Sequence, residues 1–262
     1  MRTLLARIQL FGLEIDALSL RCAVANAIAW ITEEQQTCRY IVTPNVDHVL
    51  ELQINRKFKA AYENASMVLP DGMPVVWASR LLRTPLPGRV TGVDFVMALL
   101  DSAAKRGGIS VCVLGGREGV AATAARSIRY RWPALGAVSW ITPPDNFSSH
   151  HAANSHIVEE TRRHSADILI VGLGAPKQEI WVKENLASIH ARVVVCAGGT
   201  IDFLAGRHPR APGWLQTIGG EWLFRLLREP RRLWRRYARD LIGFPPLLLA
   251  ELFRSRRSPA GD

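Results

Sequence analysis

The sequence predicts an α/β fold in which a mainly parallel sheet is covered by helices on both faces and is followed by a helical appendage. Apolar, strand-like runs alternate with amphipathic, helix-like segments through most of the chain. The strand-like runs are continuously apolar and rich in β-branched residues, which is typical of strands that are buried on both faces. Near Gly206 the composition becomes rich in Arg, which predicts a second structural unit.

The expected elements follow from this alternation. Strands are expected at residues 39–43, 109–114, 137–141, 167–172 and 192–197. Helices are expected at residues 47–64, 93–105, 119–131, 152–164 and 177–190. Residues 8–15, interrupted at Gly12, have the pattern of a small hairpin. Because ligands of such sheets bind beyond the carboxyl ends of the strands, the residues that follow each strand are the candidates for function.

Size and charge limit the organisation of the chain and its partners. The chain has 262 residues, 48% of them hydrophobic, and a formal net charge of +10. Residues 206–262 contain twelve Arg, no Lys and five acidic residues, so they carry a net charge of +7. We therefore divide the chain into a core at 1–205 and an appendage at 206–262. Such a positive charge indicates an acidic partner, which can be an anionic membrane, a phosphorylated substrate or nucleic acid.

The appendage has the pattern of a basic amphipathic helix. If residues 222–241 are helical, Arg residues share one face and apolar residues the opposite one, and Pro230 divides the helix in two. Leu and Trp beside these Arg favour a helix in a membrane interface, and an ordinary surface helix is the alternative. Nucleic acid is disfavoured as a partner because no nucleic-acid motif is present. The Arg residues of this face are Arg225, Arg228, Arg232, Arg235 and Arg239.

We expect the protein to lie on a membrane without crossing it. The longest charge-free apolar stretch of the appendage, residues 241–250, contains Pro245-Pro246, and a spanning helix needs about 20 apolar residues. Charges in residues 1–20 interrupt the apolar run that a signal peptide would need. The four cysteines form no CxxC pair, so we expect them to be buried free thiols.

Glycine and small polar residues recur directly after the expected strands. Glycine lets the backbone approach a phosphate, and the following helix N-terminus offers free N–H donors, which favours a nucleotide. The geometry of a tight turn explains the same glycines equally well. No GxGxxG fingerprint and no GxxxxGK[ST] loop occurs, so NAD and ATP are poorly supported. The candidate positions are Asn45, Gly115, Gly172, Gly174, Lys177, Glu179 and Asp202.

Asp71 follows an apolar run and precedes Gly72, and this position has two interpretations. Asp-Gly pairs are common in turns, so a turn residue is the simpler one. A carboxylate at a strand end beside a nucleotide is also suited to act as a general base. The chain has no D-x-D triplet and no ligand-like His spacing, so we expect no metal and no other cofactor. Cationic side chains would then balance a leaving diphosphate, and Arg89 is a candidate.

A series of motifs resembles one known family. The motifs are TPN at 43–45, LPDGMP at 69–74, GRVTG at 88–92, VGLGAPKQE at 171–179, GGTIDFLAG at 198–206, RAPGW at 210–214 and EWLFRLLREPRR at 221–232. In this order they resemble the WecG/TagA/CpsF family of glycosyltransferases, glycosyltransferase family 26. The likeness covers about residues 8–240, which is most of the chain.

The resemblance implies an inverting, metal-independent transfer of a sugar from a UDP-sugar to a polyprenyl-diphosphate-linked glycan, in exopolysaccharide or cell-envelope polysaccharide synthesis. It also implies a Rossmann-like core, and an appendage that meets the membrane and completes the site. The protein would then be peripheral, on the cytoplasmic face of the inner membrane. The family's catalytic base falls on Asp71. Its other site positions fall on Thr43, Asn45, Arg89, Gln178 and Asp202, and Arg210 joins the appendage arginines as a membrane or diphosphate contact.

Several alternatives stay open at this point. Family donors include N-acetylmannosamine, N-acetylmannosaminuronate and glucose, and no motif in this chain selects among them. A catalytically inactive UDP-sugar-binding protein of the membrane surface is the alternative function, and the intact Asp71, Thr43 and Gln178 argue against it. Self-association through the face that the appendage covers is a further alternative.

Overall fold

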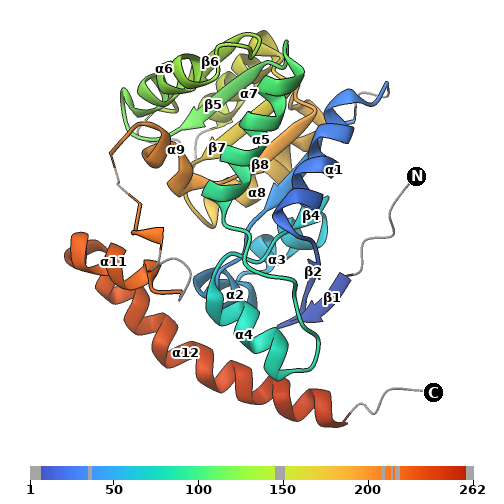
Figure 1. Ribbon diagram of the computed structural model, residues 1–262, viewed down its shortest axis with the longest axis vertical. Helices are drawn as coiled ribbons and strands as arrows, with labels where there is room; N and C mark the ends of the chain where they lie inside the picture. The colour runs from blue at the N-terminus through green and yellow to red at the C-terminus, as the bar shows by residue number, and fades with distance from the viewer. Residues whose placement is uncertain are drawn as a thin grey trace.

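The computed structural model describes residues 7–34, 37–144, 151–207, 210–213, 215 and 219–257, and omits the side chains of 151, 152, 232 and 255–257. Its centre is a six-stranded sheet in the order β4-β3-β8-β7-β5-β6, in which every pair is parallel (Figure 1). This confirms the expected α/β class. The strands are β3 (Arg39–Val42), β4 (Met67–Val68), β5 (Val111–Gly115), β6 (Val138–Ile141), β7 (Ile168–Gly172) and β8 (Val193–Cys196).

Alternate residues of each strand face two separate apolar layers, which explains why the strands are apolar throughout. Ile41 and Val113 face one layer, whereas Tyr40 and Cys112 face the other. The first layer is closed by α1 (Leu20–Thr32), α5 (Gly92–Arg106), α6 (Val120–Arg131) and α9 (Gly198–Leu204). The second is closed by α2 (Val46–Ile54), α3 (Arg56–Glu63), α4 (Met73–Leu81), α7 (His151–His164) and α8 (Lys177–Asn185), which continues as a 3-10 turn, η1 (Leu186–Ser188).

The expected hairpin is present as β1 (Arg7–Leu10) and β2 (Leu13–Asp16), an antiparallel pair. Asp16 at its end is fully buried, and its Oδ2 accepts from the backbone N–H of Val68 at 2.7 Å. Arg7 Nε donates to the other carboxylate oxygen at 3.0 Å. A hydrogen bond to a buried charge is strong, so the hairpin is fixed to β4, the strand that leads to Asp71.

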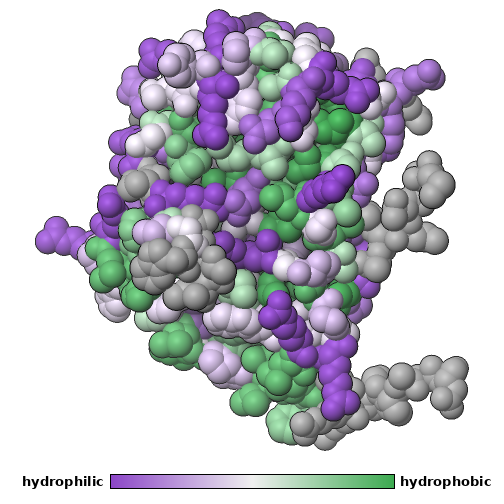
Figure 2. Space-filling model, viewed as in Figure 1, coloured by the Kyte–Doolittle hydropathy of each residue, from purple (hydrophilic) through white to green (hydrophobic). Residues whose placement is uncertain are grey.

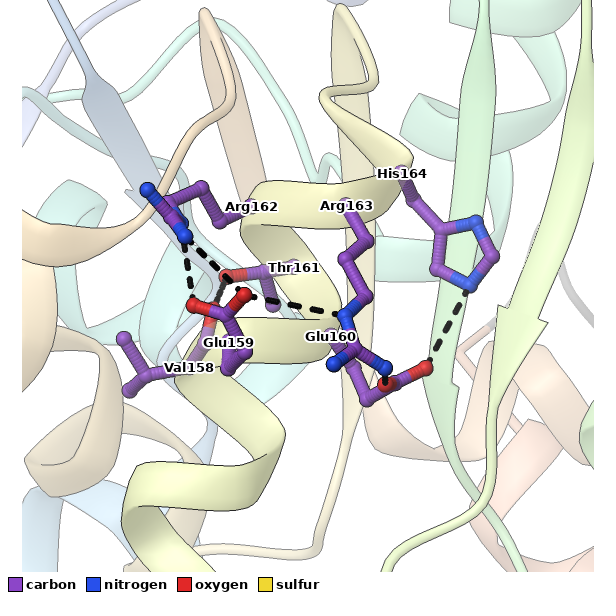
Figure 3. Close-up of polar contacts among 7 residues, drawn as sticks. All are labelled: Val158, Glu159, Glu160, Thr161, Arg162, Arg163 and His164. Carbon is purple, nitrogen blue, oxygen red and sulfur yellow. Dashed lines mark hydrogen bonds and ion pairs between the residues drawn. The ribbon is translucent and has the colours of Figure 1, made fainter.

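The outer face of α7 is an ordinary solvated face held by local ion pairs. Arg162 pairs with Glu159 at 2.9 Å, and Arg163 pairs with Glu160 at 2.8 Å (Figure 3). His164 lies 3.9 Å from the second oxygen of Glu160. Pairs at i,i+3 and i,i+4 spacing add only a few tenths of a kcal/mol each to a helix. Arg162 and Arg163 are therefore examples of arginines whose ion pairs, among the described residues, are all local.

The appendage forms two helices, α11 (Glu221–Arg228) and α12 (Pro230–Arg257), which meet at Glu229. The break directly before Pro230 confirms the expected division, because Pro is favoured at the first position of a helix, where its missing N–H would have no partner within the helix. Helix α12 nevertheless continues through Pro245 and Pro246. No described helix is both long enough and apolar enough to cross a membrane. Helix α12 lies along one end of the core (Figure 1), where Gly243 approaches Leu50 of α2 and the ring of Phe244 lies 5.3 Å from that of Phe11.

Some expectations about helices were wrong. The segment 47–64 is two helices, because Asn55 ends α2 and caps α3 by accepting from the N–H of Phe58 at 3.1 Å. The helices α1 and α4 were not expected at all.

All four cysteines are free thiols as expected, but only Cys112 and Cys196 are buried, whereas Cys22 is exposed. The boundary at 205 stays a prediction.

Candidate active site

A cavity of about 1060 Å³ opens at the carboxyl edge of the sheet. Residues that follow all six strands line it, which is the expected place for a ligand in an open parallel sheet. The appendage forms the other wall, through residues between Arg207 and Arg236. The cavity therefore requires both parts of the chain. The lining residues after the strands include Thr43, Asn45, Asp71, Gly116, Arg117, Pro143, Gly172, Gly174 and Ala197.

Three motifs far apart in the sequence meet around Asp71. Its backbone N–H donates to the carbonyl of Pro44 at 2.8 Å, and the N–H of Val90 donates to the carbonyl of Pro70 at 2.8 Å. The N–H of Gly92 points to Asp71 Oδ2 at 3.4 Å. Gly92 allows this approach, because a Cβ there would lie 3.3 Å from Thr43 Oγ1. The TPN, LPDG and GRVTG motifs thus hold one carboxyl group at the cavity.

The Asp71 carboxyl is partly buried, and its environment favours the proton-bound form. Burial raises the pKa of Asp71 to about 6, and the negative charge of Glu221 acts in the same direction. The N–H of Gly92 and the charges of Arg89 and Arg225 act against this rise. A carboxylate with a pKa close to neutral can both accept and release a proton, which is what a general base needs.

The glycines at the strand ends have different roles. A Cβ on Gly115 would lie 2.3 Å from the carbonyl oxygen of Gly172, so Gly115 is required for packing between β5 and β7. It does not line the cavity, whereas Gly116, Gly172 and Gly174 do. Packing geometry therefore explains Gly115, whereas a close approach of a phosphate to the backbone stays a prediction for the glycines that line the cavity.

Gln178 and Glu179, at the start of α8, lie at and behind the cavity wall respectively. Gln178 lines the cavity and is 3% exposed, while Glu179 is fully buried behind it. Gln178 Nε2 donates to Glu179 Oε1 at 2.8 Å. Burial raises the pKa of Glu179 to about 7, against the effect of this hydrogen bond. Glu179 supports Gln178 and does not reach the cavity, unlike its neighbour Lys177.

Positive charge surrounds the cavity from both parts of the chain. Seven cations and five carboxylates, Asp47, Asp71, Asp202, Glu221 and Glu229, line the cavity, so positive charge is in excess. Arg210 pairs with Asp94 at 2.5 Å, and Arg236 pairs with Asp47 at 3.0 Å. A cavity rich in cations and backbone N–H groups is suited to bind diphosphates. The cations of the lining are Arg117, Lys177, Arg207, Arg210, Arg225, Arg228 and Arg236.

Comparison with known proteins agrees with this geometry. Residues 8–258 match the glycosyl transferase WecG/TagA/CpsF family. The chain belongs to this family. Similar proteins include the N-acetylglucosaminyldiphosphoundecaprenol N-acetyl-beta-D-mannosaminyltransferases of Staphylococcus aureus strains MW2 and MRSA252. Each is 25% identical over 237 residues, which are 88% of this chain and 88% of the relative. The protein is therefore a glycosyltransferase.

Of the positions taken from the WecG/TagA/CpsF motifs, all but Arg89 line the cavity. Thr43, Asn45, Asp71, Gln178 and Asp202 all line the cavity. Arg89 does not line it, and instead its Nη1 pairs with Glu221 at 3.1 Å, which joins the GRVTG loop to the start of α11. This ion pair keeps Arg89 close enough to act on the charge of Asp71.

The appendage arginines do not form the single face expected from one continuous helix. Arg210, Arg225 and Arg228 line the cavity, whereas Arg235 lies over the Trp234 ring at 5.6 Å, away from the cavity. Arg239 pairs with Asp47 at the start of α2. The side chain of Arg232 lies outside the described residues. The break at Glu229 separates the helices, so one helical wheel cannot describe them both.

Sequence reasoning missed several lining residues, above all His48 and Arg236. Arg236 binds Asp47 and also donates to Asn45 Oδ1 at 3.4 Å, so α12 contacts the TPN turn directly. His48 directly follows Asp47 and belongs to none of the motifs that the sequence analysis used. No group of three or more His, Cys, Asp or Glu side chains suited to a metal ion occurs in the part of the chain that the structure describes.

Proposed function

We propose that this protein transfers a hexose or N-acetylhexosamine from a UDP-sugar to a polyprenyl-diphosphate-linked saccharide, with inversion and without a metal ion. The transfer serves exopolysaccharide or cell-envelope polysaccharide synthesis. The observation that carries the proposal is the Asp71 carboxyl, with its pKa raised to about 6, in a cavity surrounded by cations. The names of the two relatives support a polyprenyl-linked acceptor and make UDP-N-acetylmannosamine the first donor to test, with UDP-glucose as the second.

The proposed reaction is a single displacement. Asp71 takes the proton from the acceptor hydroxyl, and that oxygen forms a bond to the anomeric carbon of the donor. The bond between this carbon and the diphosphate oxygen breaks on the opposite side, and UDP leaves with the bonding electrons. Fixed positive charge stabilises the negative charge that develops on the leaving oxygen. Inversion at the anomeric carbon follows from one attack from the opposite face.

The cavity has room and charge for two diphosphates. Its volume of about 1060 Å³ is slightly above the roughly 300–1,000 Å³ that is usual for small-molecule sites. The core supplies Arg117 and Lys177 beside the glycine turns, and the appendage supplies Arg225 and Arg228 on the facing wall. We assign the core cations to the UDP diphosphate and the appendage cations to the diphosphate of the lipid-linked acceptor.

One variant pair tests the role of the appendage cations. Arg225→Gln removes a charge that faces the cavity, and we expect kcat/KM to fall by about ten- to a hundredfold, as for the loss of a charged hydrogen bond. Arg162→Gln is the matched control, because it makes the same substitution on the ion-paired face of α7 (Figure 3). Its activity should stay within about twofold of the wild type. Equal effects of the two changes would contradict the assignment.

Apolar side chains of the appendage support docking on a membrane surface. Figure 2 shows them gathered along the edge of the molecule formed by α11 and α12. On α12, Trp234, Leu241, Ile242, Leu249 and Phe253 recur at helical spacing, whereas Leu233 on the other face is buried. A stripe of exposed apolar residues beside Arg is typical of a helix in a lipid interface. With Trp222, Leu223 and Leu227 of α11, these side chains are 42% to 77% exposed.

Flotation with lipid vesicles tests this docking. The double substitution of Leu241 and Ile242 by Asp places charge in the apolar stripe, so binding to vesicles that contain phosphatidylglycerol should fall at least tenfold. Tyr130→Asp is the control, because Tyr130 is 91% exposed on α6, at the other end of the molecule (Figure 1). Unchanged flotation of the double variant would remove the membrane from the proposal and leave the transfer reaction intact.

A transfer assay tests the reaction itself. The protein is incubated with each UDP-sugar and a short-chain polyprenyl-diphosphate-N-acetylglucosamine acceptor, with and without a chelator. We expect UDP release and a new lipid-linked disaccharide whose anomeric configuration is opposite to that of the donor, at an unchanged rate with the chelator. Binding of UDP without transfer would support the inactive binding protein instead, and loss of activity with the chelator would reject the metal-free reaction.

A further inference from the structure

His48 lines the cavity, and the proposed reaction does not yet use it. It stands in the first turn of α2, three residues after Asn45, whose side chain accepts from the His48 N–H at 3.2 Å. The side chain is 8% exposed, and its ring lies edge-on to Phe58, with 5.6 Å between the ring centroids. The ring is therefore held in one position by its neighbours.

One ring nitrogen of His48 has a single buried partner. Nδ1 lies 2.7 Å from the hydroxyl of Tyr62, a side chain of α3 that is 2% exposed. In a neutral imidazole one nitrogen carries a proton and the other accepts. The Tyr62 hydroxyl has no other hydrogen-bond partner among the described residues, so its proton must go to His48 Nδ1 or remain without an acceptor.

The cost of a buried donor decides between the two tautomers. If Nδ1 carried the proton, it would donate to Tyr62, and the Tyr62 proton would be left unpaired in a buried position, which is strongly unfavourable. If Tyr62 donates, both groups are satisfied and the imidazole proton is on Nε2. Burial lowers the pKa of His48 to about 3, with a further effect of Arg236, so the ring stays neutral at working pH.

The second nitrogen faces the cavity. Among the described residues, His48 Nε2 has no hydrogen-bond partner. It is also not one of the fully buried polar atoms that lack a partner there. It is therefore accessible, and His48, which is 8% exposed, lines the cavity beside Asn45 and Arg236. Its place is at the junction of the TPN turn and α12.

We propose that His48 is a substrate-binding residue whose Nε2–H donates a hydrogen bond to an oxygen of the bound substrate, with the tautomer set by Tyr62. The acceptor is an oxygen of a diphosphate or of a sugar hydroxyl, since the neighbouring Arg236 adds positive charge. Unlike the cations around it, His48 provides a directed hydrogen bond without a charge. The assignment of a substrate to the cavity rests on the proposed function.

Two substitutions separate a substrate contact from a structural role. The amide nitrogen of Gln reaches the position of Nε2, whereas the amide oxygen of Asn reaches the position of Nδ1 and accepts from the Tyr62 hydroxyl. His48→Gln should therefore keep the contact and stay within about threefold of the wild-type kcat/KM. His48→Asn keeps a partner for Tyr62 and loses the contact, and kcat/KM should fall about ten- to a hundredfold. If His48 were only structural, His48→Asn would be the more active variant, and that order would overturn the proposal.

Two further measurements keep this inference separate from the proposed reaction. Nitrogen NMR of the full chain labelled at histidine reports the tautomer directly, and we expect protonated Nε2 in the wild type and a mixture in Tyr62→Phe. A wild type with the proton on Nδ1 overturns the inference whether or not the protein transfers sugar. Titration with UDP then identifies the oxygen: weaker UDP binding by His48→Asn indicates the donor diphosphate, and unchanged UDP binding with a raised acceptor KM indicates the acceptor.

Discussion

Replacing Asp71 by Asn should abolish transfer and at the same time stabilise the fold at neutral pH. Burial raises the pKa of Asp71 to about 6 in the folded protein, whereas an unfolded chain ionises this group at about 3.9. Between these values the folded state holds a proton that the unfolded state has lost, so stability falls as the pH rises. The loss is complete above the folded pKa of about 6 and absent below about 3.9.

The size of this effect follows from the shift. A difference of about two pKa units corresponds to at most about 3 kcal/mol, because one unit is about 1.4 kcal/mol. The carboxyl borders a cavity that water can enter, which lowers the penalty, so we expect a gain of about 1–2 kcal/mol for Asp71→Asn. The amide oxygen of Asn can still accept from the N–H of Gly92, so no new unpaired group is created.

Urea unfolding of the wild type and Asp71→Asn at about pH 5 and about pH 8 measures this gain. The advantage of the variant should grow by about 1 kcal/mol between the two pH values, with equal m-values. An advantage that is the same at both pH values would refute the raised pKa. Transfer is measured on the same samples, and near-normal turnover of the variant would refute the role of Asp71 as the base, whatever the stability.

Three other predictions are tested on the full chain and its single variants. The rate of transfer should rise with pH through an ionisation at about 6, the pKa of Asp71, and a rate independent of pH between about 5 and 8 would contradict a carboxylate base. Glu179→Gln should raise the melting temperature at about pH 8 and not at about pH 4, because burial raises the pKa of Glu179 to about 7 and its destabilising charge exists only above that value. Gly115→Ala should lower the free energy of unfolding by about 2–4 kcal/mol, since its Cβ would meet the carbonyl of Gly172. Gly119→Ala, at a positive φ of 73° instead of the 121° of Gly115 and with open space around it, should cost only about 1 kcal/mol. Equal losses for the two glycines would show that the contact is unimportant.

The sheet and its site edge were predictable because they depend on local patterns. The apolar runs are long and bordered by glycine, and the structure has strands within a residue or two of each expected range. Parallel strands all place their carboxyl ends at one edge, so Thr43 and Gly172 were expected together before any contact was known, whereas Asp71 and Gln178 were assigned to the site from the family motifs. The helix break at Pro230 is equally local, since proline acts on its own backbone.

Contacts between distant segments were not predictable in the same way. Whether an arginine faces the cavity or the solvent depends on how α11 and α12 lie against the core, and this is decided by packing such as that of Gly243 against Leu50. A helical wheel drawn from the sequence does not include the segments against which the helix packs. It therefore grouped Arg225 with Arg235, although Arg225 lines the cavity and Arg235 lies over the Trp234 ring. Arg89 likewise acquires its partner, Glu221, only through the fold.

The sequence by itself determined the α/β class, the family and the carboxylate that the proposed mechanism uses, because these depend on periodicity and on contiguous motifs. Only the tertiary structure decided that Asp71 is held between Pro44 and Gly92 and that Glu179 lies behind Gln178. It also decided that His48 turns one nitrogen to Tyr62, because burial and the pairing of hydrogen-bond donors are properties of the packed chain and not of any segment of it.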